Sequence, residues 1–157
     1  MATQRFPIRL GAKSRPLLRL FGVGGPDDAW VELGDDTFEA RFGRFRAATP
    51  LSNIAGWRIE GPWRWITAIG VRRSIRHGDV SFAGDSHGGV RMDLRQKVAW
   101  GPFHVPAVWV GADELEGFAD ELSRLGIPGI DARKRRRGFR LTWPWHWRVP
   151  RLRRRGV

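Results

Sequence analysis

The chain lacks cysteine, and this absence excludes several classes of protein at once. Without thiols it has no disulfide bonds, thiolate metal sites or cysteine nucleophiles, so its stability must come from buried apolar side chains. It also lacks a long apolar run. Stretches without charge, such as residues 105–112, are shorter than the roughly 20 residues of a membrane-spanning helix. No basic segment followed by an apolar one opens the chain, so we expect a cytoplasmic protein without a secretory signal.

Acidic residues are scarce near the C-terminus, and the charge of the chain is divided very unevenly. The 157 residues carry a net charge of +12, of which residues 131–157 hold +10 and residues 1–130 only +2. The N-terminal part is nearly balanced and, with 41% hydrophobic residues in the whole chain, is long enough to build one packed core. The basic character therefore belongs to a C-terminal tail and not to the expected globular domain.

The segment before the tail has the pattern of short antiparallel strands separated by turns. A short strand over 5–10 and a short helix over 14–21 precede it, with Pro16 suited to the first helical turn. Val90, Met92 and Leu94 alternate with charged residues, and this alternation predicts a strand with one solvent-exposed face. The strands that we expect in the main domain cover residues 29–33, 37–42, 45–48, 53–60, 66–75, 80–83, 90–94 and 107–110.

Residues 113–125 change to a helical period. Apolar side chains recur there at steps of three and four, Asp113 and Glu116 have the spacing of a capping box, and Gly126 is suited to end the helix. We expect this amphipathic helix to pack one face on the sheets. The sequence thus predicts an N-terminal strand and short helix over 1–28, a β domain over 29–126 with its closing helix at 113–125, and a basic tail over 127–157.

About seven strands followed by one amphipathic helix resemble the pleckstrin-homology-like architecture. Residues 14–126 also resemble a family of small actinobacterial proteins without an assigned activity. The segments that carry this resemblance are RPLLRL at 15–20, WVEL at 30–33, FEARFG at 38–43, TPLSNIAG at 49–56, EGPWRW at 60–65, GGVRMDL at 88–94 and VGADELEG at 110–117. The resemblance implies a mostly β fold with about seven antiparallel strands in two packed sheets, closed by one C-terminal helix. No activity carries over from this resemblance, because none is assigned to the family.

Candidate catalytic and metal-binding patterns are weak. Asp85, Ser86 and His87 are consecutive in one turn, where a histidine can rarely be oriented between a nucleophile and a carboxylate. The histidines lack the paired spacing of metal ligands. Residues 11–14, Gly-Ala-Lys-Ser, lack the glycine spacing of a phosphate-binding loop. We expect no catalytic residue, no cofactor, no metal and no small-molecule substrate. An enzyme would need a deep polar pocket lined by His87, Asp85 or Asp93.

A loop with two tryptophans forms a secondary candidate site. Trp63 and Trp65 flank Arg64, and Arg58, Arg72, Arg73 and Arg76 lie nearby in the sequence. Basic loops with tryptophan suit anionic membrane headgroups. The interpretation that we favour is that both tryptophans are ordinary core or rim aromatics.

The tail is the main candidate site. A cluster of cations precedes a row of tryptophans in which alternate residues are apolar, and a second basic cluster follows; Pro144 and Pro150 argue against a helix there. The residues that we expect to bind an anionic surface are Arg133, Lys134, Arg135, Arg136, Arg137, Arg140, Trp143, Trp145, Trp147, Arg148, Arg151, Arg153, Arg154 and Arg155.

Several partners suit this tail. Cations attract an anionic phospholipid surface and tryptophan prefers the headgroup layer, whereas RNA or single-stranded DNA would use the same arginines for phosphates and the same rings for stacking. The tail could also bind a protein partner, stay solvated, or fold back on the domain as an edge strand. We favour the membrane, because Leu141 and Val149 extend the apolar row without offering a stacking plane. The sequence predicts a non-enzymatic binding or adaptor module at the inner face of the plasma membrane.

Overall fold

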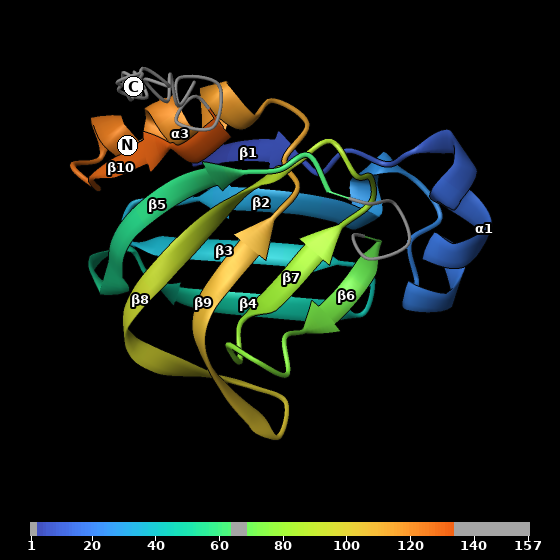
Figure 1. The fold of residues 1–157 in the computed structure, drawn as a ribbon, viewed down its shortest axis with the longest axis horizontal. Helices are drawn as coiled ribbons and strands as arrows, with labels where there is room; N and C mark the ends of the chain where they lie inside the picture. Colours follow the sequence, from blue (N-terminus) through green and yellow to red (C-terminus); the bar gives the residue numbers. More distant parts are fainter. Residues whose placement is uncertain (1–2, 64–68, 134–157) are drawn as a thin grey trace, which may run out of the picture.

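The computed structural model describes residues 3–63 and 69–133, and in this part the chain is mostly β, with two sheets and few helices (Figure 1). The first sheet is an antiparallel meander of β1 Gln4–Pro7, β2 Ala29–Leu33, β3 Thr37–Phe42 and β4 Phe45–Pro50. The second sheet has the order β10-β5-β8-β9-β7-β6. Its strands are β5 Ile54–Glu60, β6 Gly70–Arg73, β7 Val80–Ala83, β8 Gly89–Trp100, β9 Phe103–Val110 and β10 Gly129–Asp131.

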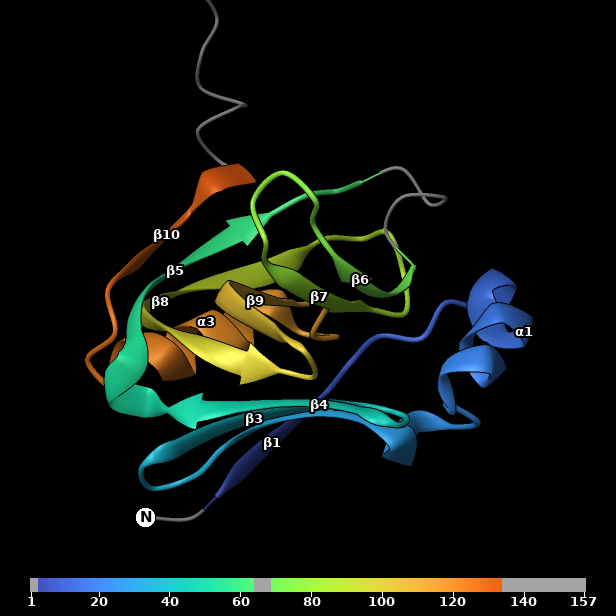
Figure 2. The same ribbon diagram turned by 90° about the horizontal axis from the view of Figure 1, so that it is seen from below.

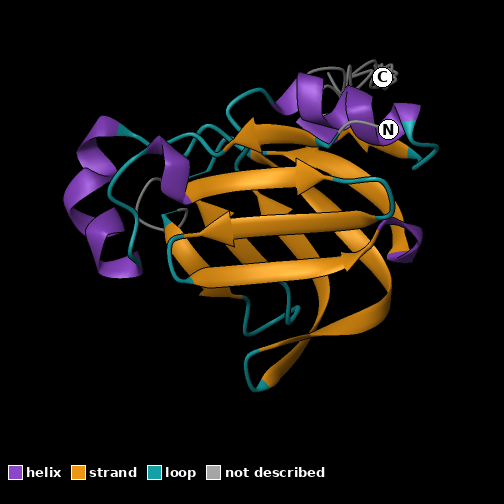
Figure 3. Ribbon diagram, turned by 180° about the vertical axis from the view of Figure 1, so that it is seen from behind, coloured by secondary structure: helices purple, strands orange, loops and turns teal. Residues whose placement is uncertain are grey.

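The two sheets form separate layers, with the four-stranded sheet on one side and the six-stranded sheet on the other (Figure 2). Seen from behind, the strands of the second sheet cross those of the first at an angle (Figure 3). Alternating apolar side chains of both sheets point into the space between them, where Val31, Phe42, Phe82 and Met92 are fully buried. The rings of Phe42 and Phe82 lie 6.5 Å apart and join the two layers.

Helix α3, Leu115–Arg124, covers one end of the layers and packs on β5 and β8. Its apolar period places Phe118 in the core, where the ring meets that of Phe6 edge-on at 5.2 Å. Gly126, with φ of +84°, ends the helix as predicted, and the amide of Ile127 donates to the carbonyl of Leu122. A second short helical segment combines α1, Arg15–Leu18, with 3-10 turns at Ala12–Ser14 and Arg19–Phe21.

The described part departs from the sequence prediction in its topology. It has ten strands where we expect about seven, and two neighbouring pairs, β7 with β9 and β10 with β5, are parallel. The helix is not the closing C-terminal element, because β10 follows it and pairs with β5. These pairings join segments far apart in the chain, so local patterns do not reveal them. Two packed sheets are found, but a pleckstrin-homology-like arrangement stays a prediction.

Two local predictions are wrong. The capping box does not form: Glu114 occupies the cap position without a side-chain hydrogen bond, and Asp113 instead accepts a hydrogen bond from Nε of Arg9 at 2.7 Å. The strand expected over 66–75 leaves the sheet at Arg73, because the chain turns at Ser74. Residues 66–68 of that strand lie outside the described residues.

Candidate functional site

The outer face of the six-stranded sheet carries a row of polar and aromatic side chains. Strand pairing places Arg58 of β5 opposite Arg91 of β8, Arg91 opposite Trp109 of β9, Trp109 beside Ser81 of β7, and Ser81 opposite Arg72 of β6. The residues before and after these positions on β8 and β9 are buried in the core. Because side chains alternate along a strand, this row faces away from the core.

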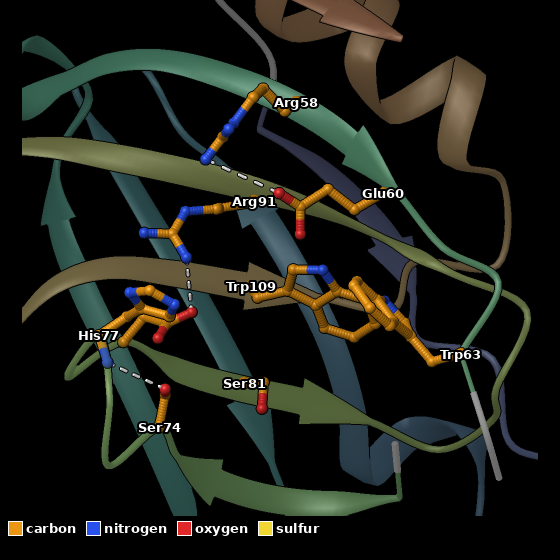
Figure 4. A pocket seen from close by; sticks show the side chains of 9 residues that line it. Arg58, Glu60, Trp63, Ser74, His77, Ser81, Arg91 and Trp109 are labelled. Carbon is orange, nitrogen blue, oxygen red and sulfur yellow. Dashed lines mark hydrogen bonds and ion pairs between the residues drawn. The ribbon is translucent and has the colours of Figure 1, made fainter. Parts of the chain in front are cut away.

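An open groove of about 670 Å³ lies on this row. Figure 4 shows the indole of Trp109 on its floor and the side chain of Trp63 at one end. Glu60 stands beside them, at the end of β5. The turn between β6 and β7 lines the opposite wall with Ser74, His77 and Asp79.

A glycine allows Trp109 to lie flat on the sheet. Gly89 is on the neighbouring strand β8, and a Cβ atom built there would lie only 2.5 Å from Cε2 of the Trp109 indole. No side chain fits at this distance, so the ring occupies the space that a residue other than glycine would fill. Trp109 is only 7% exposed although it faces outward. The pair therefore forms an apolar floor in an otherwise charged groove.

A compact ion-pair network holds the centre of the groove. Nη1 of Arg91 donates to Oδ2 of Asp79 at 2.8 Å, and its Nε donates to Oδ1 of Asp93 at 2.9 Å. Desolvation lowers the pKa of Arg91, but the hydrogen bond to Asp93 and the attraction of Asp79 and Asp93 outweigh it and hold the pKa above its ordinary value. Arg91 and Asp79 are both mostly buried, so each depends on the other for its charge compensation.

Arg58 is held more loosely. Its Nη2 lies 3.7 Å from Glu60 and 3.8 Å from Asp93, and its side chain is 45% exposed. These distances exceed those of hydrogen bonds, so the guanidinium can turn toward an incoming acceptor. With cationic and anionic groups around an indole surface, the groove can hold a polar ligand that carries both donors and acceptors.

The groove also brings Ser74, His77 and Asp79 together, but the geometry recorded there is that of a turn. The backbone amide of His77 donates to Oγ of Ser74 at 3.1 Å (Figure 4). Among the described residues no hydrogen bond joins the His77 imidazole to a hydroxyl or carboxylate. Nor do residues 3–63 and 69–133 contain a group of three or more acidic or histidine side chains placed to bind a metal ion.

The residues that would identify an enzyme lie elsewhere. His87, Asp85 and Asp93 are not among those lining the groove. Nε2 of His87 donates a hydrogen bond of 2.8 Å to the carbonyl oxygen of Ala112, and Nδ1 is buried without a partner among the described residues. Burial lowers the pKa of His87, so the ring is a neutral structural group under ordinary conditions. The absence of catalysis stays a prediction.

The structure places the secondary loop only in part. Trp63 lines the groove and is 46% exposed, which makes it a rim aromatic, whereas Arg64 and Trp65 lie outside the described residues. Sequence reasoning missed Trp109, because it stands in an apolar run, and it missed the link between Arg91 and Asp79, because one lies on strand β8 and the other in the turn before β7. Gly89, directly before the strand expected over 90–94, was the available signal for a close approach.

The root of the tail is anchored to the domain. Nε and Nη2 of Arg133 donate to the carboxylate of Asp131 at 3.0 and 2.9 Å, and Nη2 also bonds Glu116 of α3. The hydrogen bonds that Arg133 donates to Asp131 and Glu116 raise the pKa of Arg133, and the latter bond lowers the pKa of Glu116. Arg133 thus fixes where the tail leaves the domain. The other thirteen residues of the expected anionic-surface site, from Lys134 to Arg155, lie outside the described residues.

Elsewhere in the domain, many carboxylates are paired with arginines of the domain itself. The pairs with the shortest distances are Arg5 with Glu32, Arg9 with Asp113, Arg46 with Glu39, and Arg124 with Glu121. Hydrogen bonds from Arg46 and Arg124 lower the pKa of Glu39 and Glu121, so both stay ionised. These carboxylates are already engaged within the domain.

Comparison of the chain with protein-family models, with curated proteins and with solved structures finds no match. In the described ranges, no helix is long and apolar enough to cross a bilayer.

Proposed function

We propose that the protein is a non-enzymatic binding module that associates peripherally with anionic phospholipid surfaces through its basic, tryptophan-rich tail. The observation that carries this proposal is the segregation of charge: residues 131–157 hold +10 of the net +12. Near an anionic membrane each cation contributes on the order of 1 kcal/mol. Engagement of half of the cations would therefore support roughly micromolar binding.

The pairing of charges in the domain supports this assignment. Carboxylates that could attract the tail, such as Glu32, Glu39 and Asp113, already bind arginines of the domain. The exit of the tail is fixed by Arg133, beside β10 and the N-terminal half of α3. In this proposal the tail brings the domain to the membrane, and the groove of the domain is a surface on which a cargo or partner can bind.

Phospholipid suits the tail better than nucleic acid because of the apolar alternation in its sequence. Trp143, Trp145 and Trp147 share one face with Leu141 and Val149 if the chain is extended, and the two aliphatic residues gain nothing from stacking on bases. The inner face of the plasma membrane is the corresponding location. A relationship to pleckstrin-homology-like domains is part of this proposal, supported by the two packed sheets and the helix at one end.

Tryptophan fluorescence tests the proposal. Mixed phosphatidylserine and phosphatidylcholine vesicles should shift the emission of the full chain to shorter wavelength, and part of the shift should persist at high salt because the rings are inserted. Oligonucleotides should produce binding that weakens with a log-log salt slope of about −0.7 to −0.9 per phosphate neutralised. Salt-sensitive oligonucleotide binding without any vesicle-induced shift would contradict the membrane assignment and favour nucleic acid.

A further inference from the structure

Two hairpin turns lie at the end of the domain opposite α3 (Figure 1). One is the β6–β7 turn of residues 74–79, and the other is the β8–β9 turn at Gly101 and Pro102. The first turn and the strand before it contact β9: a Cβ built at Gly78 would lie 3.6 Å from the ring of Pro106, and the Arg73 guanidinium lies 4.3 Å above the ring of Phe103, the first residue of β9. We call Arg73, Ile75, Arg76 and Phe103 the hairpin-tip surface.

The β6–β7 turn holds an isoleucine in solvent. Ile75 is 100% exposed, more than any other large apolar residue of the described chain. Its turn is closed by hydrogen bonds from the amides of Ser74 and Gly78, to Asp79 and Ser74 respectively, both of 2.8 Å. The amide of His77 also donates to Oγ of Ser74. A turn closed in this way presents Ile75 outward as a fixed feature.

The β8–β9 turn adds an aromatic side chain that is also outward. Phe103 is 41% exposed, and its inner face stacks on Trp100 at 6.4 Å, which in turn stacks on Phe45 at 6.2 Å. This row of rings supports the tip of the hairpin from the side of β4. Because their faces already contact one another, these rings offer little free surface for stacking on bases.

Cations stand beside the two apolar side chains. Arg73 lies over the ring of Phe103, and Arg76, which follows Ile75 in the turn, is exposed and has no carboxylate partner within residues 3–63 and 69–133. Asp79, the acidic residue of the β6–β7 turn, is occupied by Arg91. Apolar side chains with unpaired cations beside them match the anionic headgroup layer of a bilayer, where apolar groups insert and cations meet phosphates.

From this arrangement we infer that the hairpin-tip surface is a second membrane contact, which seats the domain on an anionic phospholipid bilayer. Ile75 and Phe103 insert among the headgroups, while Arg73 and Arg76 contact lipid phosphates. The inference rests on the proposed function and adds an orientation, with α3 turned away from the membrane. The 24 residues that follow Arg133 can span at most about 80 Å, more than the roughly 35 Å breadth of such a domain, so tail and hairpins can reach one bilayer.

Site-specific labelling of the cysteine-free chain tests this orientation. Ile75→Cys and Asp120→Cys, the latter at an exposed position on α3, are each labelled in the full chain with an environment-sensitive fluorophore. With phosphatidylserine–phosphatidylcholine vesicles, the label at Ile75 should shift to shorter wavelength and be quenched by lipid-attached nitroxides, while the label at Asp120 stays aqueous. A response at Asp120 with none at Ile75 would overturn the orientation.

Binding measurements separate this inference from the role of the tail. Arg76→Gln should weaken vesicle binding of the full chain about fivefold, the equivalent of one cation. Ile75→Asp should weaken it further, whereas Ile130→Asp, the matched change at a half-exposed residue of β10, should leave it unchanged. If the full chain binds vesicles and the two hairpin variants bind as tightly as it does, the hairpin-tip surface is wrong and the tail proposal stands. If a chain ending at Arg133 retains binding that Ile75→Asp abolishes, the hairpins bind and the tail is dispensable. No binding by the full chain overturns both.

Discussion

Replacing Gly89 by alanine tests the reasoning about the floor of the groove. The new Cβ would lie within 2.5 Å of three atoms of the Trp109 indole, a rigid ring that is itself 7% exposed. Relief requires the ring to leave the sheet. Overpacking costs about 1 to 3 kcal/mol, and three contacts this close put the expected cost near the upper end. Alanine in place of glycine in a strand returns about 0.5 to 1 kcal/mol, so we expect a net loss of about 2 kcal/mol.

Urea unfolding followed by circular dichroism measures this loss, and two further variants isolate its cause. Gly111→Ala is the matched control, because the nearest neighbours of its Cβ are at ordinary contact distances of 3.5 to 3.6 Å. Trp109→Leu removes the indole, so adding Gly89→Ala to it should return about 0.5 to 1 kcal/mol and give a coupling energy of about 3 kcal/mol. The reasoning is refuted if Gly89→Ala costs no more than Gly111→Ala, or if its cost persists beside Trp109→Leu.

Three other predictions follow from the core, the ion-pair network and the buried histidine. Phe118→Ala should reduce the free energy of unfolding by about 3 to 5 kcal/mol, because the ring is fully buried against Phe6. The control Asp120→Ala, on the exposed face of α3, should change that free energy by less than about 0.5 kcal/mol. Equal effects of the two variants in urea unfolding would contradict the packing. Arg91→Met should reduce the free energy of unfolding by about 2 to 3 kcal/mol, because it leaves the mostly buried Asp79 unpaired. Adding Asp79→Leu should restore most of this stability. A double variant as unstable as Arg91→Met alone would argue against the ion pair. Burial lowers the pKa of His87 below 6.5, so the unfolded chain takes up a proton at a higher pH than the folded chain. The contribution of the neutral His87 to stability is therefore complete above pH 6.5 and is lost as the pH falls through the folded-state pKa. The dependence of the unfolding free energy on pH just below 6.5 should be weaker in His87→Gln, and an unchanged dependence would contradict the assignment.

Local patterns in the sequence predicted many elements of the fold. Strands β2, β3 and β7 have the expected bounds, and α3 lies within the expected helix, because each has a period of two or of three to four that its own burial requires. Strand β10 escaped prediction because Gly129–Asp131 is too short to show alternation and is defined by its pairing with β5. The parallel pair of β7 and β9 likewise depends on contacts that no local pattern contains.

The groove could be predicted only in pieces. Trp63 and Arg58 stood out as an aromatic and a cation near one loop, and both line it. Trp109 did not, because an apolar run in a strand gives no sign of which residue faces outward. The pairing of Arg91 with Asp79 needs the register of three strands, β8, β9 and β7, because Asp79 lies in the turn just before β7. The uneven distribution of charge could be predicted from the sequence because it does not depend on how the chain folds.

The central claim is that the tail attaches this domain to anionic membranes, and co-sedimentation with vesicles tests it most directly. The full chain and a chain ending at Arg133 are compared; the core and β10 lie within the shorter chain, and Arg133 keeps its partners Asp131 and Glu116. The account predicts that the full chain pellets with phosphatidylserine-containing vesicles and not with phosphatidylcholine alone, and that removal of residues 134–157 greatly reduces binding. Equal pelleting of both chains, or no pelleting of the full chain with anionic vesicles, would contradict it.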